Sequence, residues 1–181
     1  MKHQLWPPFL YDGKTYDLSH LNPWKLEVAD SAKVTRSILV TCADHCFTKK
    51  PDGDSAPVYP GCSRDDGRFC VERYELSLNL RQMIEHAVGG EIWLGNEERY
   101  VVIKGIDFRG RKVDYAIVFS LEKISGTEFD LRMHVRSAHK RYEDEPIDTY
   151  GSARFAHLVK LAIERKKPKR NFDRNRKRPK P

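Results

Sequence analysis

The 181-residue chain is 39% hydrophobic and 33% charged and carries a formal net charge of +7, which together suit one domain with an appendage. Its longest apolar runs, such as 38–40 and 115–119, are far shorter than the ~20 residues of a membrane-spanning helix. The first thirteen residues contain two prolines and a Trp where a signal peptide needs an unbroken apolar stretch, so we predict a cytoplasmic protein without membrane contact.

Two neighbouring segments near the N-terminus predict a β-hairpin. In Trp24–Ala29, Leu26 and Val28 alternate with charged residues, which is the period-2 pattern of a half-buried strand. Residues 33–41 are rich in β-branched side chains and follow across a turn at 30–32. We expect these two strands to pair with each other.

Four cysteines, Cys42, Cys46, Cys62 and Cys70, lie in one short window but lack the spacing of a zinc site. Structural zinc usually takes close pairs such as C-x-x-C, whereas a strand continuing from Cys42 to Cys46 would separate their sulfurs by roughly 13 Å. Only a bend after Cys42 would let it, or His45, join the other two. We therefore predict no metal and no other cofactor, and interpret the thiols as small buried side chains. A zinc-stabilised module and a nucleophilic pair of Cys46 with His45 stay open as alternatives.

Residues 48–67 predict a long loop, because three prolines and three glycines leave no room for a regular element. We place this loop at 48–68, inside a single domain that spans 1–164. Long loops in compact domains tend to be functional or disordered. A loop that folds back on the preceding strand would bring together His45, Arg64, Arg68 and Arg73. The simpler interpretation is that these are exposed charges and an ordinary histidine.

Two segments have the apolar periodicity of amphipathic helices. From Leu76 onward, apolar side chains recur at helical spacing until Gly89 and Gly90 stop them, which predicts one helix over 76–88. A second helix is predicted over 152–167, with its apolar side chains on one face.

Three strands are predicted between these helices, at 99–106, 112–123 and 128–138. The turns at 109–110 and 125–126 are too short for parallel crossovers, so the strands should form an antiparallel meander. The predicted fold class is therefore α+β: a mostly antiparallel twisted sheet with two helices packed on one face, followed by a disordered basic arm.

The last predicted strand presents a row of basic side chains. Arg132, His134 and Arg136 are spaced i, i+2, i+4, so they should point away from the core, with acidic neighbours or solvent as their ordinary partners. The same residue types serve a metal-independent ribonuclease, in which a His moves the 2′-OH proton and an Arg stabilises phosphorane charge. The predicted catalytic candidates are His45, Arg73, His134, Arg136 and His139.

The positive charge of the chain is concentrated at its C-terminus. Residues 165–181 contain ten basic residues and one acid, a net charge of +9, while the other 164 residues carry 23 basic and 25 acidic residues. With three prolines and dense like charge, this arm should be disordered and should bind polyanions. A solubility tail, or one that touches acidic proteins or lipid headgroups, is the competing interpretation. The candidate nucleic-acid contacts are Arg132, Lys140 and Arg141 in the body and Lys166, Lys167, Lys169, Arg170, Arg174, Arg176, Lys177 and Arg178 in the arm.

Four short segments carry a resemblance to a known family: YDLSHLNPW at 16–24, HCFT at 45–48, FCVERYELS at 69–77 and VRSAH at 135–139. With these motifs, spread over most of the body, the chain resembles a bacterial family whose members are often labelled stationary-phase growth adaptation protein or heat shock protein C. More distantly, a helix followed by a meander that ends in Ser-Ala-His is similar to the barnase, EndoU and RelE group of ribonucleases and toxins. His139 stands where those proteins often have an aromatic residue.

Two functions of different classes follow from these observations. The first is nucleic-acid binding, RNA more readily than DNA, by a protein that is also a small metal-independent, toxin-like ribonuclease. The second is a non-enzymatic stress or accessory protein that binds nucleic acid through its arm and a protein partner through its body. Kinases, Rossmann enzymes and serine hydrolases are disfavoured because their glycine-rich and nucleophile motifs do not occur in the chain.

Overall fold

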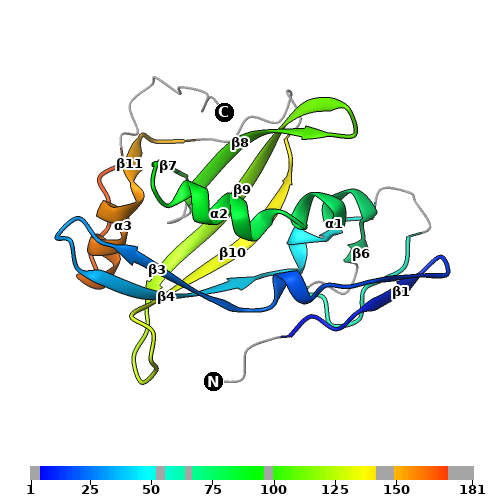
Figure 1. Ribbon diagram of the computed structural model, residues 1–181, viewed down its shortest axis with the longest axis horizontal. Helices are drawn as coiled ribbons and strands as arrows, with labels where there is room; N and C mark the ends of the chain where they lie inside the picture. The colour runs from blue at the N-terminus through cyan, green and yellow to red at the C-terminus, as the bar shows by residue number, and fades with distance from the viewer. Residues whose placement is uncertain (1–4, 52–55, 64–66, 96–99, 142–148, 171–181) are drawn as a thin grey trace.

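The computed structural model describes residues 5–51, 56–63, 67–95, 100–141 and 149–170 of the chain, with backbone alone at 103–104. It is built on a seven-stranded sheet in the order β11-β7-β8-β9-β10-β4-β3, beside two small two-stranded sheets (Figure 1). This is the α+β architecture that the sequence predicts. In chain order the elements are β1 (Phe9–Tyr11), β2 (Lys14–Tyr16), η1 (Ser19–Leu21), β3 (Trp24–Ala29), β4 (Thr35–Cys42), η2 (Asp44–Cys46), β5 (Thr48–Lys49), β6 (Arg68–Phe69), α1 (Val71–Ser77), α2 (Leu80–Ala87), β7 (Glu91–Leu94), β8 (Tyr100–Phe108), β9 (Arg111–Lys123), β10 (Leu131–Lys140), β11 (Ser152–Arg154) and α3 (Phe155–Ile163).

The predicted antiparallel meander is present as β8, β9 and β10, preceded by β7. Its strands begin and end within three residues of their predicted limits. Arg109 and Gly110 connect β8 to β9 with φ angles of 49° and 75°, the left-handed pair that a two-residue hairpin turn requires. Gly110 adopts such an angle at no steric cost, which is why the turn forms at this position.

The predicted hairpin is β3 and β4, in which Trp24 lies opposite Val40. On its other edge β4 pairs with β10 in parallel, with Ile38 beside Leu131. This parallel pair is an addition to the predicted sheet. A period-2 pattern tells which face of a strand is buried, but it does not tell which strand lies alongside.

The single helix predicted over 76–88 is wrong in detail, because the structure has two helices, α1 and α2, in this region (Figure 1). The backbone leaves helical geometry at Asn79, and Leu78 beside it is half exposed, so no burial holds the chain helical there. Asn is a residue that competes for backbone hydrogen bonds and favours helix starts. The helical region also begins earlier than predicted, because Val71 and Tyr74 pack against the core.

The helix predicted over 152–167 is shorter than expected at both ends. Residues 152–154 form β11, which pairs with β7 and places Ser152 opposite Trp93. At the other end, the N–H groups of Arg165 and Lys166 donate to the carbonyls of Ala162 and Leu161 at 3.1 and 2.8 Å. These two bonds and the left-handed φ of 55° at Arg165 form a Schellman helix end, which reverses the chain before its lysines can extend the helix.

We expect Arg165→Gly to raise the free energy of unfolding by about 1 kcal/mol, because Gly adopts the left-handed conformation without the steric cost of a Cβ. Urea denaturation of the full chain measures this change. Arg165→Ala is the matched control, since it removes the same side chain but keeps the Cβ, and should change stability by less than about 0.5 kcal/mol. Equal stability of the two variants would contradict this account of the helix end.

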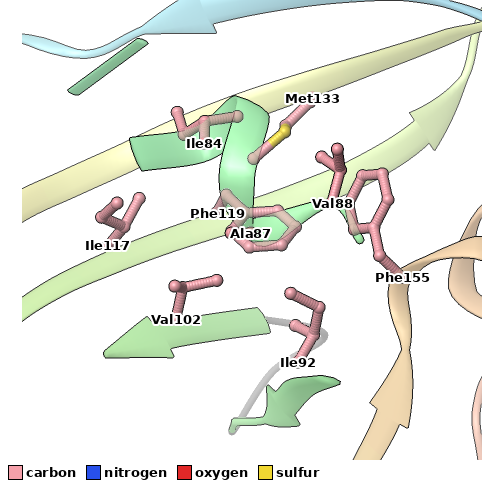
Figure 2. Close-up of a pocket in the computed structure, with 9 residues that line it drawn as sticks. All are labelled: Ile84, Ala87, Val88, Ile92, Val102, Ile117, Phe119, Met133 and Phe155. Atoms are coloured by element: carbon pink, nitrogen blue, oxygen red, sulfur yellow. The ribbon is translucent and has the colours of Figure 1, made fainter. Parts of the chain in front are cut away.

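The main core lies between the sheet and the two helices α2 and α3, which pack on the same sheet face. Figure 2 shows its centre, where Ile84 from α2 and Phe155 from α3 face Phe119 from β9. Phe155, Phe119 and Ile84 are each no more than 1% exposed. All the side chains around this small cavity are apolar, so it is part of the core and offers a polar ligand nothing to bind.

A second, aromatic layer ties down the predicted long loop. Within its described part, the loop is closed by a two-residue pairing of β5 with β6, so the prediction that it contains no regular element is wrong. Tyr59 from the loop packs 4.8 Å from Phe47 and 6.1 Å from Trp6, measured between ring centroids. Burial of these rings explains why a proline-rich segment is held against the sheet. Residues 52–55 and 64–66 of the loop lie outside the described part.

Candidate nucleic-acid interface

The row of basic residues predicted on the last strand is present on the outer face of β10. Leu131 and Val135 are fully buried beneath α1, α2 and η2, whereas Arg132 and His134 are half-buried and Arg136 is exposed. The alternation arises because successive side chains of a strand point to opposite faces of the sheet. Three basic side chains therefore stand side by side on a surface that the helices do not cover.

His134 is the residue of this row whose surroundings suit chemistry best. The parallel register places it beside Thr41 of β4, whose Oγ1 lies 3.0 Å from His134 Nδ1. Burial lowers the pKa of His134, and the neighbouring charges of Arg132 and Arg136 lower it further, against a weaker opposite effect of Glu122. The ring is therefore neutral at pH 7. In the tautomer that carries the proton on Nδ1 and donates it to Thr41 Oγ1, the other nitrogen, Nε2, is able to accept a proton.

The two arginines of the row differ in their partners. Arg132 donates to Glu122 Oε2 at 2.8 Å, a surface pair worth at most about 1 kcal/mol. Asp130, the other acid expected nearby, instead accepts a hydrogen bond from the backbone N–H of Ser37 at 2.9 Å. No ion pair within the described residues involves Arg136. A phosphate can therefore reach Arg136 without displacing a carboxylate that the structure describes.

A β-bulge decides where His139 lies. Val135 is opposite Phe119 and Ser137 is opposite Val118, so Arg136 is an extra residue on β10. Strict alternation from Val135 would put His139 on the core face, but the bulge returns Ala138 to that face and places His139 opposite Ala116.

His139 is unsuited to carrying a positive charge. Burial lowers its pKa to about 4, and the charge of Arg73 acts in the same direction. Its Nδ1 is buried and has no hydrogen-bond partner among the described residues. His139 is therefore neutral at physiological pH, and protonating it costs free energy.

Arg73 of α1 holds the turn that contains His45. Its Nη1 donates to the carbonyl oxygens of His45 and Thr48 at 3.1 and 2.6 Å. These bonds bring Arg73 to the backbone of His45, and they commit one guanidinium nitrogen to that backbone. Arg73 therefore positions η2 and β5, and its predicted role as a phosphate ligand stays a prediction.

The other members of that predicted cluster are not assembled around His45. Arg68 Nη1 donates to the carbonyl of Ala56 at 3.2 Å, and Arg64 lies outside the described residues. The neighbour of His45 is Asp44, whose Oδ2 lies 3.8 Å from His45 Nδ1. Asp44 is almost fully buried and accepts hydrogen bonds from the N–H and hydroxyl of Ser63, which fastens the long loop to η2.

The predicted catalytic residues do not converge on one point. His134 and His139 are five positions apart on β10, a separation of roughly 15 Å at the rise of a strand. Groups that act on one phosphodiester bond must each reach it within hydrogen-bond distance. The structure therefore offers two separate places: the outer row 132–136, and the junction of η2 and α1 with the end of β10.

Comparison with protein families shows to which family the chain belongs. Residues 8–163 match the model of the YjaZ family. The chain belongs to the YjaZ family. The match covers the whole sheet and all three helices of the described part, but it does not include the stationary-phase and heat-shock labels or the likeness to small ribonucleases. A search of curated proteins and a search of solved structures each return no match.

In this YjaZ-family protein the first residues of the basic arm contact the body. Arg170 Nε donates to the carbonyl of Gly95 at 3.0 Å, and Lys166 pairs with Glu164 at 2.8 Å. Lys167 and Lys169 are exposed. The predicted contacts Arg174, Arg176, Lys177 and Arg178 lie outside the described residues, and the disorder of the arm stays a prediction.

Two further predicted contacts of the YjaZ-family chain lie at the end of β10. Lys140 Nζ is 3.6 Å from Glu72 Oε1 of α1, so part of its charge is compensated. The backbone N–H of Arg141 donates to the carbonyl of Asp114 at 2.8 Å, which extends the pairing of β9 and β10. The Lys140 side chain therefore borders α1.

Cys42 and Cys46 of this YjaZ-family protein are buried in the core, and Cys62 packs against it. The chain bends after Cys42, as a shared metal would have required, and this brings the Cys42 and Cys46 thiols together. A hydrogen bond to Cys46 and burial raise the pKa of Cys42, and burial raises the pKa of Cys62 to about 11. Thiols with raised pKa values are poor nucleophiles and ligands. Within the described ranges no three His, Cys, Asp or Glu side chains gather closely enough to hold a metal ion.

Thr41 is a partner of His134 that was not predicted from the sequence. The sequence also left open whether Glu122 or Asp130 pairs with Arg132. Thr41 and His134 are 93 positions apart and meet only through the parallel pairing of β4 with β10. No local pattern reports such a pairing, so no signal in this one sequence could have found it.

In the described part of this YjaZ-family chain, no helix is long and apolar enough to span a membrane.

Proposed function

We propose that the protein binds nucleic acid, RNA more readily than DNA, through the outer face of β10 and the basic arm at 165–181. The observation that carries this proposal is the row of Arg132, His134 and Arg136 on the sheet face that the helices do not cover, in a chain whose net positive charge is concentrated in the arm. Cationic side chains on an open surface bind phosphates and release counterions, which favours association with polyanions. A row of cations along one strand also suits a single-stranded nucleic acid, whose phosphates can follow it.

The two basic regions should act independently. In the sheet order, β9, β8 and β7 separate β10 from β11, which corresponds to roughly 19 Å at the usual strand spacing. Groups that far apart, with no shared partner, generally contribute additively to a binding free energy. Charge changes at the row and in the arm can therefore be tested separately and together.

We expect Lys166→Gln, Lys167→Gln and Lys169→Gln combined to weaken binding of a single-stranded RNA and to flatten its salt dependence. For single strands the slope of log K against log salt changes by about 0.7 for each phosphate that the protein no longer neutralises, so the slope of the triple variant should be shallower by about 2. Arg136→Gln should make the slope shallower by about 0.7. Fluorescence anisotropy over a salt series measures both. Lys14→Gln with Lys33→Gln is the control, because these exposed lysines lie in β2 and in the turn between β3 and β4, and an equal change there would contradict the proposal.

A second candidate, cleavage of RNA by the same row, is favoured by the surroundings of His134. A neutral imidazole beside two arginines can accept the 2′-OH proton through Nε2, while Arg132 and Arg136 stabilise the negative charge that develops on the phosphorus oxygens. The 2′-oxygen would then bond to phosphorus to give a 2′,3′-cyclic phosphate, and the P–O5′ bond would break as the 5′-oxygen takes a proton from water or from the His134 imidazolium. Binding stands without this chemistry, so a protein that holds RNA but does not cut it fits the first proposal alone.

A further inference from the structure

A groove lies where the arm leaves the body, between the β11 edge of the sheet, α3 and the chain that follows α3. Leu94, Ala153 and Leu161 give it an apolar part, and Ser152 and His157 add polar groups. The remaining wall is the segment 166–169, which contributes three lysines. Among the described residues that line the groove, none is acidic.

The lysine wall is held at both ends. After the helix end at Arg165, the N–H of Lys166 donates to the carbonyl of Leu161 at 2.8 Å. Four residues later, Arg170 Nε donates to the carbonyl of Gly95 at 3.0 Å, just beyond β7. The segment between them therefore crosses the sheet edge as a strap. Cations on an anchored strap lose less conformational entropy when they bind an anion than cations on a free tail.

The C-terminal end of α3 does not repel an anion as strongly as an open helix end would. Its last carbonyl groups carry partial negative charge unless they are hydrogen-bonded. Here the carbonyls of Leu161 and Ala162 accept the two bonds of the Schellman end, and that of Ile163 accepts a bond from Lys123 Nζ at 3.1 Å. The one nearby carboxylate among the described residues, Glu164, pairs with Lys166. Lys169, which is in no ion pair within the described residues, therefore gives the described part of the groove a net positive charge.

The apolar part of the groove adjoins an open strand edge. β11 is the terminal strand of the sheet, with Ala153 opposite Ile92 and the flanking bonds Phe155 N–H to Gly90 and Leu94 N–H to Gly151. By the alternation of an antiparallel ladder, the backbone N–H and C=O of Ser152 point away from β7. Such an edge offers a donor and an acceptor to a planar ring with hydrogen-bonding edges, and an aliphatic chain could not use them.

We propose that this groove binds one nucleotide, with the phosphate against the lysines of the strap and the base between the apolar side chains and the edge of β11. The inference rests on the proposed function, which gives the arm a general attraction for polyanions. It adds a specific nucleotide site at the start of the arm. A free nucleoside monophosphate and the terminal nucleotide of a strand share this chemistry.

The test is calorimetric titration of the full chain with a nucleoside 5′-monophosphate, with the matching nucleoside, and with inorganic phosphate. The monophosphate should bind saturably and at least about tenfold more tightly than either half, because each half satisfies only one side of the groove. Equal binding of inorganic phosphate, equal binding of the nucleoside, or no saturable binding of the monophosphate would each overturn the inference. An oligonucleotide that carries a terminal phosphate should compete with the monophosphate if the ligand is a strand end, and should fail to compete if only free nucleotides enter.

Lys169→Glu should weaken binding of the monophosphate by about tenfold, since it reverses one charge close to the phosphate. The exposed Lys33→Glu, in the turn between β3 and β4, makes the same charge change elsewhere and should leave that affinity unchanged. Equal weakening by both variants would overturn the assigned site. The outcomes separate this inference from the proposed function: RNA binding that depends on Arg136, without saturable binding of the monophosphate, rejects the groove alone, whereas nucleotide binding without RNA binding rejects the interface alone.

Discussion

Replacement of His134 with Ala is expected to slow cleavage of single-stranded RNA in EDTA by about 10²- to 10⁴-fold, the usual contribution of a positioned general base. The pKa of His134 is lowered by burial and by Arg132 and Arg136, so the base is already deprotonated at pH 7 and the rate should fall only as the pH drops below neutrality. Gel analysis of a labelled oligonucleotide under single-turnover conditions measures the rate. RNA binding by the variant should be nearly unchanged, because a neutral ring adds little phosphate attraction.

Two controls sharpen this experiment. Thr41→Val removes the hydrogen bond to His134 Nδ1 but leaves the ring in place, so it should reduce the rate less than His134→Ala and alter its pH profile. His86→Ala removes an exposed histidine of α2, outside both proposed sites, and should leave the rate unchanged. RNA that remains intact with the wild-type protein in EDTA would reject the ribonuclease candidate and leave nucleic-acid binding as the function to test.

His139 should make the protein less stable in mild acid. Its pKa is about 4 in the folded state, against about 6.5 for an unfolded histidine. Between these values the unfolded chain takes up a proton that the folded chain does not, so the free energy of unfolding falls as the pH is lowered. The full difference is about 3 kcal/mol, is absent above pH 6.5 and is complete near pH 4. His139→Gln should remove this part of the pH dependence.

The measurement is the difference in unfolding free energy between wild type and His139→Gln at several pH values, since acidic residues that also titrate cancel in that difference. The variant should gain on the wild type as the pH falls from 6.5 toward 4.5. His157→Gln, on the exposed surface of α3, should show no such gain. A constant difference between wild type and His139→Gln across this range would show that His139 is not held neutral by burial.

The side chains of β10 show which part of the candidate site can be predicted from the sequence. The alternation of Leu131, Met133 and Val135 with basic residues was enough to predict that Arg132, His134 and Arg136 share the outer face of a strand, because side-chain direction in a strand is a local property. The same rule misplaces His139. The extra residue at Arg136 reverses the sheet face to which each later side chain of β10 points. A bulge depends on how two neighbouring strands pair, which the sequence of one strand does not show.

Helix limits show the same division. The apolar spacing after Leu76 predicted a helical region against the sheet, which α1 and α2 occupy, because an amphipathic face must be buried. The break at Asn79 and the short helix α3 were not predictable from that spacing. They depend on contacts and backbone conformations that form only in the folded chain. Residues 152–154 form β11 because they pair with β7, and α3 ends where Arg165 adopts a left-handed conformation.

The sequence by itself determined the α+β class, the meander, the hairpin of β3 and β4, the outward basic row and the concentration of positive charge after residue 164. Each of these follows from periodicity, turn residues or composition, which act over a few neighbouring positions. Only the tertiary structure decided that β4 lies parallel to β10, that Thr41 meets His134, that Arg73 holds the turn of His45, and that the start of the arm forms one wall of a groove. These contacts join residues that are up to 93 positions apart, and their partners are selected by the packing of the whole sheet, which no local pattern encodes.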